Sequence, residues 1–359
     1  MTFKYKFMIY RKLGRTNLNV SVIGLGGGVF NRQKDPSITL KKAKEVIKFA
    51  VSKGINFIDM GKEYDEEFIS KAMEEVKEKM YVITRSEARN AEEMERDIED
   101  SIRKLKVKPA IYEIMVNSPE ELKNIKKEGV IDVLREAKLN GKIGFTGIFT
   151  HRIDVLKEAI KTNEFDVVMT LYNAVHRMAE EVFSLKKKYE FGFIAAAPFA
   201  TGILVDPKYD ENVHMPGSEF MTAENALKFV LSSPYVDATV IGMKTTQHIE
   251  ENLNVLDRKL NLTKKEREKI SKTMEEFLGK EFCRMCRYCE GCVPNVSIAD
   301  VLKLLTIAKS YGYINFVKWQ YSFFKNKMSN IDLKKCEKIC PYKLPIAKLL
   351  DELKEVVEK

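Results

Sequence analysis

Long hydrophobic runs are missing from the 359-residue sequence, and no stretch is apolar enough over sufficient length to span a bilayer. The first residues, MTFKYKFMIYRKLG, also lack the apolar segment of a secretory signal peptide. We therefore expect a cytoplasmic protein without a membrane partner. Structural disulfides are rare in that reducing compartment, so cysteines that cluster in the sequence usually bind metal or take part in redox chemistry.

Glutamine is also scarce, whereas lysine and glutamate are interspersed along the expected helices. This composition is typical of thermophile-like surfaces. A net charge of +9 is one signature of nucleic-acid binding, but here the lysines form no separate basic block. A nucleic-acid partner is therefore not expected.

Short β-branched runs alternate with amphipathic helical patterns through the first 260 residues. Eight such units, each of about 30 residues, predict an α/β fold, the (β/α)8 TIM barrel. The alternative is a doubly wound open sheet, which carries a G-x-G-x-x-G phosphate loop after its first strand. No such loop follows the first run here, which favours the barrel. The predicted strands are 20–26, 55–60, 81–86, 110–116, 142–149, 166–173, 192–199 and 238–244.

Catalytic residues of such barrels lie at the C-terminal ends of the strands. The second predicted strand ends near Asp59, with Tyr64 in the following loop, and the third ends near Arg85. The eighth ends in Lys244, after which a helix opens with Thr245. Free N–H groups at a helix start favour an anion, and a lysine adds a charge suited to phosphate. The alternative is that Thr245 only caps the helix.

Several segments, in order along the chain, resemble the aldo-keto reductase family. They are YRKLGRTNLNVSVIGLG (10–26), GINFIDMGKEYD (54–65), VLREAKLNGKIGFTGIFTH (133–151), FDVVMTLYN (165–173) and VIGMKTTQHIEENL (240–253). The resemblance covers residues 8–258 and implies a TIM barrel that binds NADP(H) across its top face. It also implies cofactor-binding roles for Asn173, Gly242, Met243, Lys244, Thr245, His248, Glu251 and Asn252.

The family reduces carbonyls with a tetrad of aspartate, tyrosine, lysine and histidine, in which the tyrosine is the general acid. The resemblance assigns the first two roles to Asp59 and Tyr64. Arg85 stands at the lysine position and Met115 at the histidine position. Arginine cannot be deprotonated in a protein and methionine is no proton donor, so we expect a degenerate catalytic tetrad.

The nicotinamide pocket implied by the resemblance is changed as well. Phe149 and Met169 stand where the family holds the carboxamide with a serine and a glutamine. His151 and His176 lie in top-face loops, where each is either a substitute proton donor or an ordinary loop histidine.

All six cysteines lie beyond residue 280. Four fall at every third position of CRMCRYCEGC, a close variant of the ferredoxin pattern C-x2-C-x2-C-x3-C-P. CEKICP (336–341) matches the end of a second such run, and a tail of this kind occurs in a branch of the aldo-keto reductases. Zinc is the rival metal, but zinc ribbons separate their cysteine pairs by about 15–20 residues. The candidate iron–sulfur ligands are Cys283, Cys286, Cys289, Cys292, Cys336 and Cys340.

Ferredoxin spacing groups Cys340 with the first three cysteines around one [4Fe–4S] cluster. Cys292 and Cys336 cannot complete a second four-thiolate set, so they either ligate a degenerate site or stay free. We therefore expect three parts: an aldo-keto reductase-like barrel (1–260), a connecting helix (261–280) and a small helical, ferredoxin-like iron–sulfur domain (281–359).

Two classes of function fit these features. The first is an NADP(H)-linked oxidoreductase whose 4Fe-4S cluster exchanges electrons with the barrel, or with a ferredoxin or other redox protein. The alternative is a non-catalytic iron–sulfur protein that serves in electron transfer, sensing or scaffolding on a degenerate barrel. Asp59, Tyr64 and the phosphate site favour the enzyme, whereas Arg85 and Met115 favour the alternative. No motif identifies a substrate.

Overall fold

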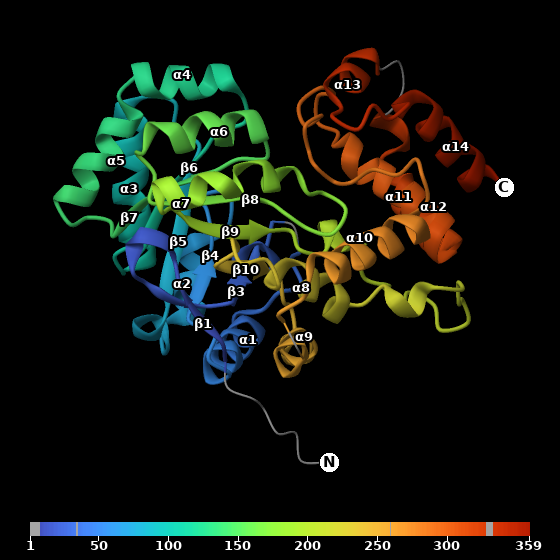
Figure 1. The fold of residues 1–359 in the computed structure, drawn as a ribbon, viewed down its shortest axis with the longest axis horizontal. Coiled ribbons are helices and arrows are strands. Elements are labelled where there is room, and N and C mark those ends of the chain that lie inside the picture. Colours follow the sequence, from blue (N-terminus) through green and yellow to red (C-terminus); the bar gives the residue numbers. More distant parts are fainter. Residues whose placement is uncertain (1–7, 34, 259, 328–332) are drawn as a thin grey trace. The chain divides into compact units, whose positions relative to one another are not determined.

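The computed structural model describes residues 8–33, 35–258, 260–327 and 333–359. Eight parallel strands form the closed barrel that the sequence predicts (Figure 1). Seven of them follow one another in chain order around the barrel, and the eighth, β10, closes the ring between β9 and β3, which excludes a doubly wound open sheet. The barrel strands are β3 (Ile23–Gly26), β4 (Phe57–Asp59), β5 (Tyr81–Ser86), β6 (Ile111–Met115), β7 (Phe145–Phe149), β8 (Val167–Leu171), β9 (Gly192–Ala196) and β10 (Ala238–Ile241).

The first predicted strand, 20–26, is in fact two strands. β2 (Asn19–Ser21) pairs antiparallel with β1 (Tyr10–Lys12), and β3 alone enters the barrel. The Ser21 hydroxyl donates to the carbonyl of Ile23, which fixes the break between the two strands. The continuous β-branched run therefore contributes one strand to each of two sheets.

Helices follow the barrel strands, as the alternating pattern predicts (Figure 1). α1 illustrates how local chemistry sets their bounds, because it begins after Thr39, whose side chain accepts the Lys42 N–H, and ends just before Gly54. Gly54 has φ 91°, and a Cβ there would lie 2.9 Å from Met8 and Tyr10 side-chain atoms. The helices are α1 (Leu40–Ser52), α2 (Glu66–Met73), α3 (Ala91–Leu105), α4 (Pro119–Lys127), α5 (Val130–Leu139), α6 (Ile153–Thr162), α7 (Lys186–Tyr189) and α9 (Thr246–Leu253).

Side chains inside the barrel form one apolar cluster, to which alternate residues of the strands contribute. Phe57, Ile83 and Ile111 occupy it from neighbouring strands β4, β5 and β6. Because side chains alternate along a strand, residues two positions further along point to the same interior, nearer the C-terminal ends. Asp59, Arg85 and Glu113 occupy those positions, so the fold gathers three ionisable residues above the apolar layer.

The chain divides into two compact units. The first holds the barrel and comprises residues up to Tyr172, Met178–Pro198 and Val230–Asn261. The second comprises Asn173–Arg177, Phe199–Phe229 and Leu262–Lys359. The boundaries at 260 and 280 stay predictions.

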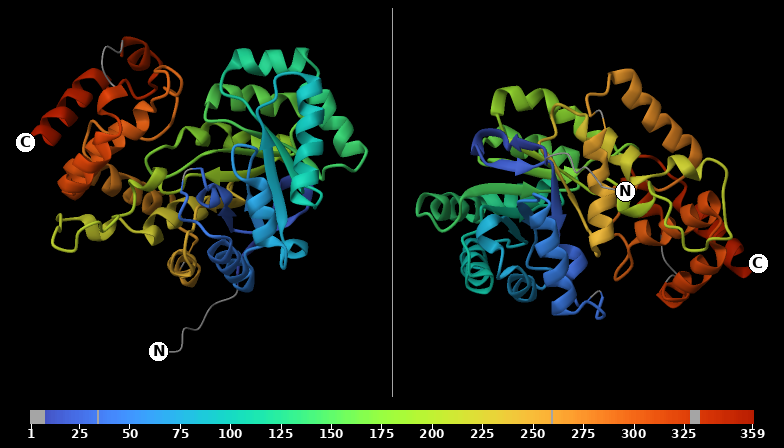
Figure 2. Two further views of the ribbon diagram at one scale, coloured as in Figure 1. Left: turned by 180° about the vertical axis from the view of Figure 1, so that it is seen from behind. Right: turned by 90° about the horizontal axis from the view of Figure 1, so that it is seen from below.

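The second unit is helical in its C-terminal part, and α11 and α14 pack side by side within it (Figure 2). Its elements are α10 (Lys264–Leu278), α11 (Ile298–Tyr311), α12 (Ile314–Ser322), α13 (Lys334–Ile339) and α14 (Ile346–Glu358), and α8 (Ala223–Leu231) begins in it. α10 starts with a capping box between Thr263 and Glu266. Among the described residues, no helix combines the length and the apolar character needed to cross a membrane.

Candidate active site

Arg85 lies at the centre of the barrel's upper layer, with only 2% of its surface exposed. Its guanidinium contacts three carboxylates at once: Nη2 donates to Asp59, Nη1 lies 3.0 Å from Glu63 Oε1, and Nε lies 3.3 Å from Glu113 Oε2. The guanidinium carbon also lies 4.7 Å from the ring centre of Phe149. Each of the three guanidinium nitrogens of Arg85 therefore contacts a carboxyl group.

Three carboxyl groups surround one cation, and burial has the largest effect on the pKa values of Asp59 and Glu113. Burial raises the pKa of Glu113 to about 8 and that of Asp59 to about 6, although the positive charge of Arg85 pulls both downward. Glu113 therefore keeps a proton near neutrality. Its Oε1 has no hydrogen-bond partner among the described residues, which is costly for a charged oxygen and agrees with a protonated acid.

Tyr64, the predicted general acid, lies beside this cluster. Its ring centre is 5.9 Å from the Arg85 guanidinium carbon, and a Cβ on Gly28 would approach its ring to 3.1 Å. Burial, followed by the negative charge of Asp59, raises the pKa of Tyr64 to about 12, and Arg85 opposes this only in part. The site therefore makes the phenol a weaker acid, opposite to what general acid catalysis near neutrality needs.

Met115, Phe149 and Met169, the residues predicted to replace polar groups of the family, lie in the same barrel interior. Met115 is on β6 two residues beyond Glu113 and packs against the apolar cluster. The sulfur of Met169 lies 3.9 Å from Arg85 Nη2. Met169 and Phe149 thus give Arg85 apolar neighbours beside its carboxyl partners.

Glu63 and Glu113 were not among the predicted site residues, yet both contact Arg85. A signal for Glu113 exists in the sequence, because a glutamate stands at an inward position of the otherwise apolar strand IYEIM. Gly147, the β7 residue opposite Glu113, supplies the room: a Cβ there would lie 2.7 Å from Glu113 Cγ. Glu63 lies in a loop, where no periodicity marks it.

The predicted phosphate-binding residues lie together after β10. The Thr245 side chain accepts the His248 N–H at 3.1 Å and caps α9, and the Lys244 N–H lies 3.4 Å from His248 Nδ1. Lys244 Nζ is 2.9 Å from Asp35 Oδ2, an ion pair that the sequence did not suggest. Of the other predicted members, Met243 and Asn252 are buried, Gly242 and Glu251 are exposed, and Glu251 accepts from Gln247.

Asn173 and the two loop histidines have other partners. Asn173 Oδ1 accepts the backbone N–H groups of Val175 and His176, so its side chain shapes its own loop. His176 Nδ1 lies 2.6 Å from the Tyr342 hydroxyl, and burial, followed by Arg284, lowers the pKa of His176 to about 4. His151 packs edge-on against Phe149, with ring centres 5.0 Å apart.

The six cysteines fall into two classes. Cys292 and Cys336 form a disulfide, which corrects the prediction that both are metal ligands or free, because sulfurs bonded to each other are not available thiolates. The other four are free and buried: Cys283, Cys286, Cys289 and Cys340. Burial, followed by the charges of the other thiols, raises the pKa of Cys283. Within the described ranges, no three His, Cys, Asp or Glu side chains are arranged to hold a metal ion.

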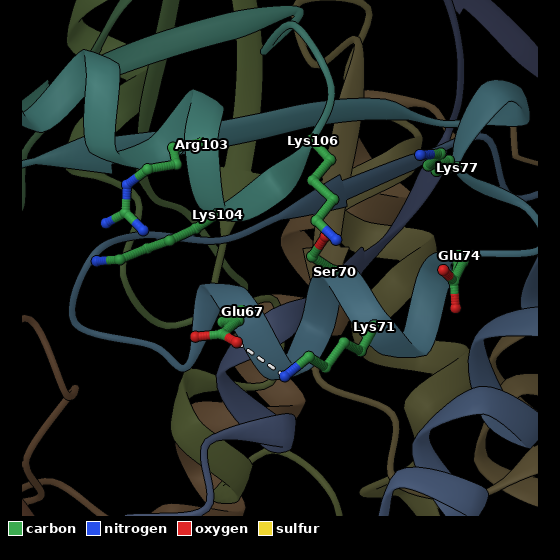
Figure 3. Close-up of a pocket in the computed structure, with 8 residues that line it drawn as sticks. All are labelled: Glu67, Ser70, Lys71, Glu74, Lys77, Arg103, Lys104 and Lys106. Atoms are coloured by element: carbon green, nitrogen blue, oxygen red, sulfur yellow. Dashed lines mark hydrogen bonds and ion pairs between the residues drawn. The ribbon is translucent and has the colours of Figure 1, made fainter.

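A pocket of about 190 Å³ lies on the outside of the barrel between α2 and α3 (Figure 3). Two of its lining residues, Glu67 and Lys71, form an ion pair at 2.8 Å, whereas Arg103 and Lys104 pair with Asp100 outside the lining. None of the predicted site residues lines it. The lining residues are Glu67, Ser70, Lys71, Glu74, Lys77, Arg103, Lys104 and Lys106.

The buried acid Glu113 predicts a dependence of stability on pH. Its pKa is raised from 4.5 to about 8 on folding, so its contribution is fully present below 4.5 and is lost as pH rises through about 8. Glu113→Gln should remove this part of the slope, roughly 5 kcal/mol, in urea unfolding measured across that range. Glu99→Gln, at an exposed glutamate of α3, is the control. An unchanged slope in Glu113→Gln would contradict the protonated state.

Comparison with known proteins agrees with the barrel fold. The model of the aldo/keto reductase family matches residues 22–275. The uncharacterized oxidoreductase YqkF of Bacillus subtilis is 23% identical over 71% of this chain and 93% of its own length. L-galactose dehydrogenase of Arabidopsis thaliana is 22% identical over 68% and 86%.

Among solved structures, the holo form of aldo-keto reductase AKR11C1 from Bacillus halodurans superposes with a TM-score of 0.64 at 22% identity, over 75% of this chain and 97% of that one. An aldo-keto reductase from Pseudomonas aeruginosa, PA4992, gives a TM-score of 0.61 at 21% identity, over 71% and 98%. These likenesses concern the fold. The family match spans well over half of the sequence, and the chain belongs to the aldo/keto reductase family.

Proposed function

We propose that this protein is an NADP(H)-linked oxidoreductase whose degenerate tetrad makes it a poor reductase of simple aldehydes. The observation that carries the proposal is the Arg85 cluster, because Asp59 and Tyr64 stand at the family's catalytic positions around a cation that cannot move a proton. Family membership favours a redox role over a scaffold role, so the non-catalytic alternative is not favoured.

The residues present fit the phosphate end of a dinucleotide. Lys244 supplies a positive charge at the start of α9, where the positive end of the helix dipole favours an anion. Phe149 and Met169 offer the nicotinamide ring apolar surfaces but no hydrogen bond for its carboxamide. NADPH held by these residues would supply the hydride for reduction of a substrate carbonyl.

The protein's own part in carbonyl reduction is to place a proton on the substrate oxygen. Tyr64 is the family-matched group that can give one, and the fixed charge of Arg85 favours its anion. The raised pKa of Tyr64 shows that Asp59 and burial outweigh this help. Arg85 orients the carboxylates and the phenol but cannot reprotonate Tyr64, so each turnover depends on a slow external proton source.

We also propose that Cys283, Cys286, Cys289 and Cys340 hold one [4Fe–4S] cluster. What supports this is the donor set: four free, buried thiols, the number of thiolates that one cluster takes. Binding requires the four sulfurs to draw together from their present arrangement. A cluster carries single electrons, which suits exchange with a ferredoxin or another redox protein.

Nucleotide binding should depend on Lys244. Loss of one charge-assisted contact in Lys244→Met should cost roughly 1.5 kcal/mol, which is about tenfold in the Kd for NADPH measured by fluorescence titration. Lys142→Met, which removes another surface lysine paired with an acid, is the control. No binding of NADPH to the native protein at millimolar concentration would sink the dinucleotide proposal.

Carbonyl reduction should be slow and should require Tyr64. We expect little NADPH oxidation with simple aldehydes, and none in Tyr64→Phe. Arg85→Lys, Glu113→Gln and Met115→His combined should raise the rate by roughly 10²-fold, because a lysine and a histidine supply proton transfer and the glutamine avoids an unpaired buried acid. Brisk turnover by the native protein would refute this reading of the site.

Purified under anaerobic conditions, the protein should contain iron and sulfide equivalent to one [4Fe–4S] cluster. Cys286→Ser should lose the cluster, because three thiolates leave one iron without its ligand. The double variant Cys292→Ala, Cys336→Ala should keep it, since the disulfide uses neither of the proposed ligands. Zinc without sulfide, or iron for two clusters, would rule out the assignment.

A further inference from the structure

The segment after β3 reaches the predicted phosphate site. β3 pairs with β10 in parallel, so the residues that follow the two strands start from the same edge of the barrel. From the first of these segments, Asp35 Oδ2 lies 2.9 Å from Lys244 Nζ. The lysine that would receive a phosphate already faces a carboxylate.

We propose that Asp35 is a specificity-determining residue that lowers the preference for a nicotinamide dinucleotide carrying a 2′-phosphate over one carrying a free 2′-hydroxyl. The proposal rests on the dinucleotide binding proposed above, with the adenosine ribose and not the pyrophosphate placed at Lys244. It concerns which dinucleotide the site takes, a property that the family match does not decide.

The Asp35 carboxylate is held in place by its own turn. Its Oδ1 accepts the Ser37 hydroxyl at 2.6 Å and the Ser37 N–H at 3.2 Å, which leaves Oδ2 for Lys244. The Asp35 N–H donates to the carbonyl of Asn31 at 3.0 Å, and its carbonyl accepts the Ile38 N–H at 3.2 Å. These contacts make the carboxylate a fixed part of the site. The bonds to Ser37, followed by Lys244, lower the pKa of Asp35 to about 2, so it is ionised at neutral pH.

Charge then distinguishes the two dinucleotides. A phosphate monoester carries about two negative charges, so it meets a lysine whose charge Asp35 offsets, with the carboxylate repelling it at close range. A ribose 2′-hydroxyl carries no charge and can donate to a carboxylate, the arrangement by which acidic residues select NAD in other folds. Asp35 thus favours one partner by repelling the other, which is how binding sites commonly discriminate.

The test is the ratio of two affinities. Fluorescence titrations at fixed ionic strength give the Kd of NADPH and of NADH for the native protein and for Asp35→Asn, an isosteric change that keeps the Ser37 contact. We expect Asp35→Asn to bind NADPH five- to tenfold more tightly and NADH equally or less tightly. Asp100→Asn, which removes the same charge from a surface ion pair on α3, should change neither affinity.

The outcomes separate the two proposals. If the native protein binds either nucleotide but Asp35→Asn shifts both by one factor, or leaves NADPH no tighter, the role of Asp35 is refuted and dinucleotide binding stands. If neither the native protein nor Asp35→Asn binds either nucleotide, both proposals fall. Thermal melting followed by circular dichroism verifies that each variant is folded.

Discussion

The buried guanidinium of Arg85 is the interaction on which the upper barrel depends. It ties β4, β5, β6 and the loop after β4 together through Asp59, Glu113 and Glu63. Removing one partner of such a buried pair costs about 3–5 kcal/mol, because the remaining charge is left without compensation. Gly147 on β7 belongs to the same arrangement, since any larger residue would push Glu113 out of reach of Arg85. Residues from four neighbouring strands therefore pack around one buried cation.

The same arrangement limits the proton transfer that the proposed reductase activity would need. A lysine in place of Arg85 would offer three rotatable donors and a proton that can leave. Arginine offers a rigid fork, and here each of its nitrogens faces a carboxylate. The contacts of Arg85 are rigid, but its guanidinium has no proton that it can transfer. Tyr64 illustrates the result, because burial, followed by the negative charge of Asp59, raises the pKa that general acid catalysis near neutrality needs lowered.

Sequence periodicity was sufficient for the barrel, because strands buried on both faces read as short β-branched runs between amphipathic helices. It also located Asp59, Arg85 and Lys244, which stand at strand ends that share one edge. It missed Asp35, because a loop residue carries no periodic signal and its partner is over 200 positions away in the chain. The pairing of Cys292 with Cys336 was missed for a different reason. Connectivity depends on where the chain brings thiols together, which spacing alone does not encode.

The Cys292–Cys336 disulfide reduces the number of cysteines in the C-terminal region that are available to bind a metal. Six cysteines in a ferredoxin-like pattern left Cys292 and Cys336 without a defined role, and a second, incomplete metal site was one solution. Joining the two by a covalent bond closes a loop with a sequence separation of 44 residues and connects the segment after α10 to α13. The bond reduces the entropy of the unfolded chain by closing this loop, and Cys289 and Cys340 lie just outside its two ends. A pair of thiols that cannot complete a cluster can thereby help to hold together the segments that supply the remaining four.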